Sequence, residues 1–69
     1  MAGYDEFLCA VARAERRGVS PASLWAISEE LGWTGSALEL EAELDQRVAE
    51  VRLRRQQLGR DDPSYWLPA

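Results

Sequence analysis

The chain lacks histidine and lysine altogether, and it contains one cysteine, Cys9. One cysteine cannot form an internal disulfide, and without histidine no zinc site of the usual cysteine and histidine kind can be built. The side chain that most often serves as a general acid or base is also missing. A domain of this size buries only about 60% of its unfolded surface. We therefore expect it to gain stability by self-association or by docking on a larger protein.

Long apolar segments are absent as well. No stretch approaches the ~20 apolar residues needed to cross a bilayer, and the chain does not begin with the basic and apolar pattern of a signal peptide. A lone cysteine is typical of a reducing compartment. These features predict a cytoplasmic protein that does not associate with membranes.

Negative charge predominates, with a net charge of −4 and only arginine among the basic residues. An acidic balance disfavours a nucleic-acid partner. The acids are concentrated between residues 29 and 50, where seven of them accompany Arg47 alone, whereas residues 51–60 contain four arginines and no acid. We therefore expect the partner to be another protein.

Apolar spacing and helix-end signals predict two short helices. The first covers about residues 4–17 and stops at Gly18. The second begins at Ser20-Pro21, an N-cap followed by a proline at the first helical position, and it ends at Gly32. The expected inner face of the first helix consists of Tyr4, Phe7, Leu8, Val11 and Ala14.

A third, longer helix is predicted from Ser36 to Leu58. Ser36 and Glu39 form a capping box, and good helix formers follow as far as Leu58. Such a rod measures roughly 33 Å, too long for two short helices to cover. It carries a main apolar stripe that includes Val51 and Leu58, and a second apolar face. The second face, predicted to mediate self-association in a homodimer, consists of Leu38, Ala42, Ala49 and Leu53. The alternative is that the first two helices straddle the rod and cover both faces.

The last ten residues contain two prolines and a cluster of turn residues, which exclude further regular helix. The fold class predicted from the sequence is therefore all-α. We expect a small three-helix domain at residues 1–59, with a long C-terminal helix, followed by an extended aromatic tail at residues 60–69.

Residues 24–44 resemble a helix-turn-helix motif. The stretch from Ile27 to Gly32 matches the motif's pattern of apolar, small, polar and turn residues, and Leu38 takes the position of the buried aliphatic residue in its second helix. The resemblance implies that this second helix would enter the major groove of DNA. Here that helix carries four acids before its first arginine, Arg47. Its carboxylates would be repelled by the phosphates of DNA. We therefore expect the chain to adopt the shape of the motif but not to recognise DNA.

Three tryptophans in so short a chain are a high number, and aromatic residues dominate binding hot spots. We predict that they anchor a partner together with the tail, while acids of the third helix supply charge complementarity. The predicted partner-binding residues are Trp25, Trp33, Glu39, Glu41, Glu43, Tyr65, Trp66 and Leu67. The alternatives are that Trp33 and the tail pack within the protein or its dimer, and that the acids form a solvated face.

No catalytic, metal-binding or cofactor-binding residues are predicted. Glu41 and Asp45 lie one helical turn apart, a spacing that suits acid–base or metal chemistry, but a solvated face explains them better. Arginines near Cys9 would favour its thiolate, although an incidental cysteine is more common. We predict a non-enzymatic, protein-binding regulator or inhibitor that occludes a surface on a larger protein, such as an accessory factor of a bacterium or phage. The alternatives are a DNA-binding regulator and a structural or assembly subunit.

Overall fold

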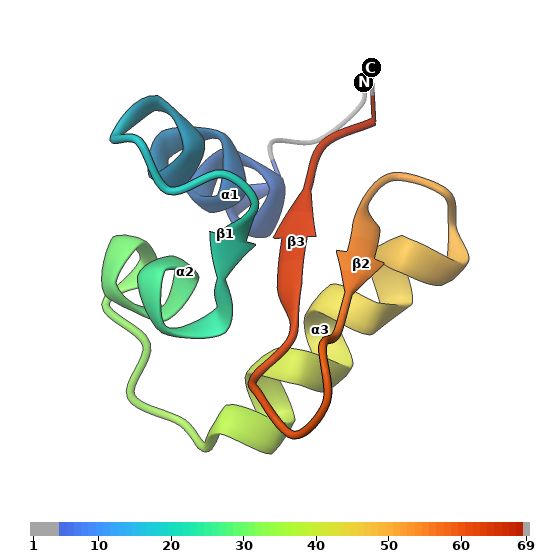
Figure 1. Ribbon diagram of the computed structural model, residues 1–69. Helices are drawn as coiled ribbons and strands as arrows, with labels where there is room; N and C mark the ends of the chain where they lie inside the picture. The colour runs from blue at the N-terminus through green and yellow to red at the C-terminus, as the bar shows by residue number, and fades with distance from the viewer. Residues whose placement is uncertain (1–4, 69) are drawn as a thin grey trace.

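The computed structural model describes residues 5–68, which form three helices and a three-stranded antiparallel sheet. The elements are α1 (Glu6–Arg16), β1 (Ala22–Ser23), α2 (Leu24–Leu31), α3 (Ala37–Ala49), β2 (Arg54–Gln56) and β3 (Ser64–Trp66). The strand order is β1-β3-β2, and Figure 1 shows β3 in the middle of the molecule with β2 on one side and β1, α1 and α2 on the other. The all-α prediction is therefore wrong, and the protein is a small α/β domain.

The start of α1 is fixed by its N-cap. The Asp5 carboxylate accepts hydrogen bonds from the amides of Phe7 at 3.0 Å and Leu8 at 3.4 Å, two of the amide donors that a helix start leaves without backbone partners. The helix ends at Arg16, and Gly18 follows with a φ of 97°. The first predicted helix is thus confirmed, apart from Tyr4, which lies outside the described residues.

Helix α2 begins later than predicted. Its N-cap is Ser23, whose hydroxyl accepts a hydrogen bond from the amide of Ala26 at 3.1 Å. The Ser20-Pro21 signal was misread, because the chain first forms β1, which pairs with β3. The predicted end of the helix at Gly32 is confirmed, with Gly32 in the left-handed conformation at a φ of 65°.

Helix α3 is much shorter than predicted. The capping box is confirmed, since the Ser36 amide donates to the Glu39 carboxylate and the Glu39 amide to the Ser36 hydroxyl, each at 3.1 Å. The helix then ends at Ala49 instead of continuing to Leu58. The residues after it turn back into the short strand β2.

The end of α3 is closed by two backbone hydrogen bonds. The amide of Arg52 donates to the carbonyl of Arg47 at 2.9 Å, and the amide of Val51 donates to the carbonyl of Val48 at 3.0 Å. This pair of bonds is the Schellman motif, which requires a left-handed residue and normally has glycine there. Val51 takes that position here, with a φ of 61°. Its side chain is 72% exposed, so it lies outside the core.

The reversal after α3 explains why the sheet forms. It turns Leu53 inward, and β2 then pairs with β3 so that Arg55 lies opposite Tyr65. The segment predicted as an extended tail therefore supplies the central strand, and the Tyr65 side chain is fully buried. The buried core consists of Ala10, Val11, Ala14, Ala22, Leu24, Ile27, Leu40, Leu44, Leu53 and Tyr65.

Candidate functional site

One end of the molecule is formed by the start of α3 and the tip of the β2–β3 hairpin, which lie at the lower edge of Figure 1. The turn between α2 and α3 is held there by Trp33. Its amide donates to the carbonyl of Ser28 and its indole Nε1 donates to the carbonyl of Ser36, each at 3.0 Å. We call this end of the molecule the end face and define it by Trp25, Leu38, Leu58 and the groove described next.

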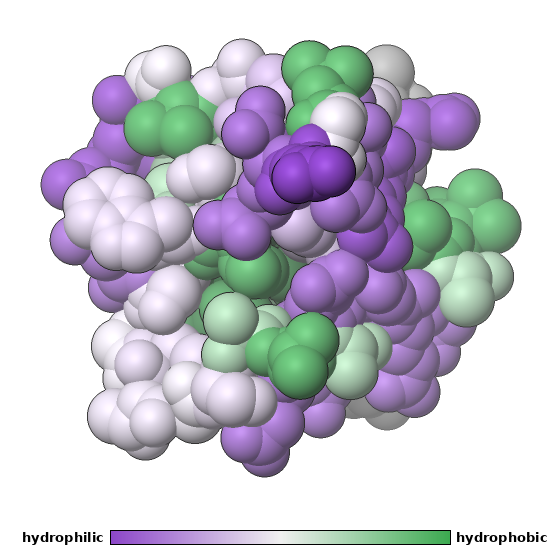
Figure 2. All heavy atoms as spheres, turned by 60° about the horizontal axis from the view of Figure 1, so that its bottom comes forward, coloured by the Kyte–Doolittle hydropathy of each residue, from purple (hydrophilic) through white to green (hydrophobic). Residues whose placement is uncertain are grey.

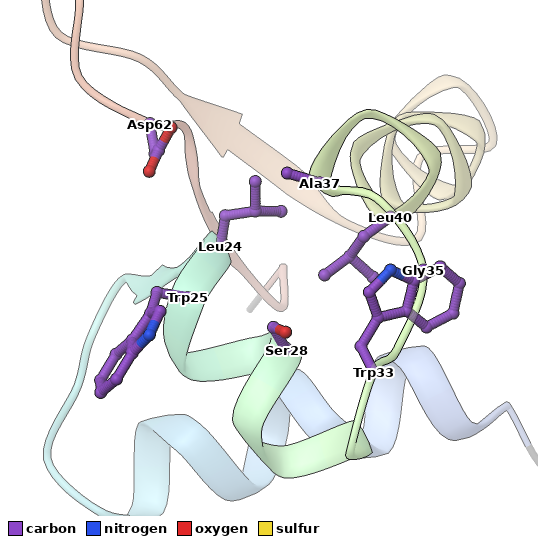
Figure 3. A pocket seen from close by; sticks show the side chains of 8 residues that line it. All are labelled: Leu24, Trp25, Ser28, Trp33, Gly35, Ala37, Leu40 and Asp62. Atoms are coloured by element: carbon purple, nitrogen blue, oxygen red, sulfur yellow. The ribbon is translucent and has the colours of Figure 1, made fainter.

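A groove of about 230 Å³ opens between α2, the α2–α3 turn and the hairpin. Figure 3 shows Leu24 and Leu40 between the two tryptophans, with the Trp33 indole on one side and the Trp25 indole projecting outward at the other edge. The groove is smaller than the roughly 300–1,000 Å³ of pockets that hold small-molecule ligands. Its size suits a single inserted side chain. The complete lining is Leu24, Trp25, Ser28, Trp33, Gly35, Ala37, Leu40 and Asp62.

Large apolar side chains are exposed at this end of the molecule, and one of them, Trp25, lines the groove. Leu38 is 78% exposed, Trp25 67% and Leu58 64%. Figure 2 looks towards this end and shows apolar atoms both within a central hollow and on the raised surface beside it. Leu38 was expected at a buried position of the α2–α3 pair, and that expectation is wrong. The phase of α3 turns Leu40 and Leu44 inward and leaves Leu38 in solvent.

The acids of α3 are mostly engaged within the chain. Arg55 contacts Glu41 at 2.9 Å and Asp45 at 3.2 Å, and the Tyr65 hydroxyl donates to Asp45 at 2.9 Å. These contacts tie α3 to β2 and β3. Hydrogen bonds from the amide and hydroxyl of Ser36 lower the pKa of Glu39. Glu39 and Glu41 therefore have structural roles in addition to any contact with a partner.

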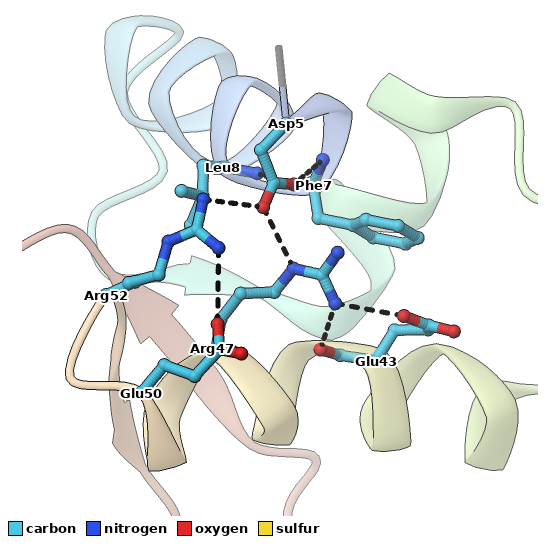
Figure 4. A network of polar contacts seen from close by, with 7 residues as sticks. All are labelled: Asp5, Phe7, Leu8, Glu43, Arg47, Glu50 and Arg52. Atoms are coloured by element: carbon cyan, nitrogen blue, oxygen red, sulfur yellow. Dashed lines mark hydrogen bonds and ion pairs between the residues drawn. The ribbon is translucent and has the colours of Figure 1, made fainter. Parts of the chain in front are cut away.

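A second network ties α1 to the end of α3 (Figure 4). Asp5 accepts from Arg47 at 3.1 Å and pairs with Arg52 at 3.0 Å, while Arg47 also contacts Glu43 at 2.9 Å. The Arg47 guanidinium lies 4.4 Å from the centre of the Phe7 ring. Burial raises the pKa of Asp5, but the hydrogen bonds from Arg47 and from the helix amides outweigh it and hold the pKa below its usual value.

The aromatic residues predicted as partner anchors are in different environments. Trp25 is exposed, and Trp33 is half-buried with its ring 5.9 Å from that of Phe7 in an edge-to-face contact. Trp66 and Leu67 are half-buried. Tyr65 cannot contact a partner from its fully buried position, so its assignment as an anchor is corrected. For Tyr65, the alternative holds that the tail packs within the protein.

The four residues predicted to mediate self-association do not share one surface. Leu38, Ala42 and Ala49 are exposed on α3, but Leu53 is buried in the core. Leu53 was placed on the same face because the helix was expected to continue through it. The end of α3 at Ala49 removes it from that face.

Residues 5–68 show no metal-binding cluster and no membrane-spanning helix. This part of the chain contains no group of three or more cysteine, aspartate or glutamate residues arranged to hold a metal ion. Cys9 is a half-buried free thiol. None of the helices within these residues has the length and apolar character needed to cross a membrane.

Comparisons with protein-family models, curated proteins and solved structures find no match to this chain.

Proposed function

We propose that this protein is a non-enzymatic binding protein that uses its end face to cover a surface on a larger protein, as a regulator or inhibitor. The observation that carries the proposal is the exposure of Trp25 at an apolar groove, together with the exposure of Leu38 in the first turn of α3, next in sequence to the groove residue Ala37. Burying a large apolar side chain contributes about 1.5–3 kcal/mol. Exposed apolar side chains that cluster around a concave site are typical of protein interaction surfaces.

The position of the end face also supports this proposal. In a helix-turn-helix, the start of the second helix meets the target, and here the corresponding segment is the start of α3. Residues 37–46 contain four acids and no basic residue. Charges of this sign would repel phosphates, whereas apolar and acidic side chains together suit a protein surface.

The experiment is quantitative affinity capture from a lysate of the native host, comparing the wild-type chain with Leu38→Ser and Trp25→Ala. We expect both variants to lose the same captured protein. The matched control is Val51→Asn, which removes a similarly exposed apolar side chain at the other end of α3. Equal recovery of that protein with Leu38→Ser, Trp25→Ala and the control would overturn the proposal.

DNA binding is the second candidate, because α2, the turn and α3 follow one another as the two helices of a helix-turn-helix do. It predicts retention on duplex DNA that weakens steeply as salt is raised, because released counterions drive such binding. We expect no retention even at low salt. Retention at low salt that Arg60→Gln and Arg54→Gln weaken would favour DNA as the target, since both arginines are exposed on the hairpin.

A further inference from the structure

We propose that the groove of the end face receives one bulky apolar side chain from a basic segment of the partner protein, with lysine or arginine next to that side chain. This inference rests on the proposed function and adds the chemistry of the partner. It follows from the size of the groove, the environment of its two indoles and the sign of the charges around it.

The size of the groove limits what can occupy it. Its volume is about 230 Å³. This volume suits one leucine, methionine or aromatic side chain and lies below the usual range of pockets for drug-sized ligands. Seven of the eight lining residues carry no charge. An inserted apolar side chain therefore replaces water without leaving a charge buried and unpaired.

The two indoles that flank the groove differ in how firmly they are held. Trp33 is fixed by its hydrogen bond to the carbonyl of Ser36 and by its contact with the Phe7 ring. Trp25 is 67% exposed and projects from the first turn of α2. An inserted side chain would therefore meet one pre-formed wall, and the partner segment that carries it would cover the exposed indole at the edge of the groove. Covering Trp25 removes a large apolar area from water, the property that makes tryptophan a frequent hot spot.

The charges beside the groove are mainly negative. Asp62 is an exposed residue that lines the groove, and Asp61 precedes it in the exposed hairpin tip. Neither carboxylate is in an ion pair in the part of the chain that the structure describes. Arg60 is the one basic residue of the tip at 57–63, and no basic residue lines the groove. A cationic segment would pair with Asp61 and Asp62, whereas an acidic segment would be repelled.

The same charges disfavour a second copy of this chain as the occupant. The exposed Leu58 of another copy would arrive together with that copy's own Asp61 and Asp62. The whole chain has a net charge of −4, so two copies repel each other at long range. A basic partner meets neither obstacle.

The test is to pan a random peptide library against the immobilised whole chain and to measure binding of the enriched peptides in solution. We expect enrichment of a single bulky apolar residue flanked by lysine or arginine. Nuclear magnetic resonance should show shifts of the indole N–H signals of Trp25 and Trp33 on binding. Trp25→Ala should weaken binding about tenfold or more. Asp62→Asn should weaken it less and reduce its dependence on salt.

Val51→Asn is the matched control and should bind as the wild type does. Lack of enrichment, enrichment of acidic or uncharged peptides, or unchanged binding by Trp25→Ala would each overturn the inference. A dimer that forms with rising concentration and is lost in Leu38→Ser would also overturn it, because a second copy would then occupy the end face.

The two proposals fail in different ways. If the host protein is lost with Leu38→Ser but cross-linking shows that its contacting segment is not basic, the proposed function stands and this inference fails. If basic peptides bind at the two indoles but no host protein depends on Leu38, the groove chemistry stands and the proposed function fails.

Discussion

Replacing Asp5 tests whether one carboxylate joins the start of α1 to the end of α3. Asp5 is the N-cap of α1 and also binds two arginines, and its side chain is only 11% exposed (Figure 4). Asp5→Ala removes the cap, which costs about 1 kcal/mol, and the charged hydrogen bond from Arg47, which costs about 1.5–3 kcal/mol. The Arg47 side chain is 16% exposed and keeps its contact with Glu43. Arg52 is half-exposed, so its pairing adds little.

We expect Asp5→Ala to lower the free energy of unfolding by about 3 kcal/mol, a large share of the roughly 3–10 kcal/mol typical of a chain of this length. Asp5→Asn should cost less, because the amide oxygen still caps the helix. The assay is urea unfolding followed by tryptophan fluorescence. The control is Glu6→Gln, which removes the same charge at the adjacent exposed residue and should change stability by a few tenths of a kcal/mol.

The pH dependence gives an independent check on Asp5. Its pKa in the folded protein lies below the ordinary value of 3.8, so its stabilising effect is present above pH 3.8 and is lost as the pH falls through the folded pKa. The stability difference between wild type and Asp5→Asn should therefore shrink as the solution is acidified below that value. A difference that stays constant with pH, or a loss in Asp5→Asn no larger than in Glu6→Gln, would contradict the stabilising role of the Asp5 carboxylate.

The remaining predictions use the same unfolding assay. Val51→Gly should stabilise the protein by about 1 kcal/mol, because glycine adopts a positive φ without the roughly 1–2 kcal/mol that other residues incur, and a loss of stability would contradict the left-handed turn after α3. Tyr65→Phe should cost about 1 kcal/mol through loss of the 2.9 Å hydrogen bond to Asp45, and no change would argue against that contact. Leu53→Ala should cost about 2–5 kcal/mol, while Leu38→Ala should change stability by less than about 0.5 kcal/mol. Similar costs for the two leucines would contradict the burial of Leu53 or the exposure of Leu38.

The helix starts and stops that were predicted correctly depend on contacts within a few residues. The capping box joins Ser36 to Glu39, three residues away, and the left-handed position that ends α2 is one that glycine fills without strain. Such signals are fully present in the local sequence. The start of α2 shows their limit, because Ser20 and Ser23 offer the same capping chemistry and the pairing of β1 with β3 selects Ser23.

The sheet could not be predicted because its signals are not local. Strand β2 has the sequence Arg-Arg-Gln, which favours helix, and it has no apolar alternation. It becomes a strand because β3 pairs with it across the hairpin while Leu53 and Tyr65 are buried on the same core. Tertiary contacts thus override helix propensity in this segment.

The candidate site was predicted in part. The abundance of tryptophan identified Trp25, which the structure leaves exposed. Leu38 was chosen for a different role, because its exposure depends on the rotation of α3 relative to the core. Asp62 was missed entirely, since it joins the groove only when the hairpin folds back beside α2. Knowledge of the hairpin would have been needed to find it.

The proposed function requires that the end face contacts another protein. The most direct test is hydroxyl-radical footprinting of the chain alone and in the complex captured from host cells. We predict that oxidation of Trp25 and Leu38 falls strongly in the complex, while oxidation of Val51, exposed at the other end of α3, stays unchanged. Unchanged oxidation of Trp25 and Leu38 in a complex that protects Val51 would contradict the claim.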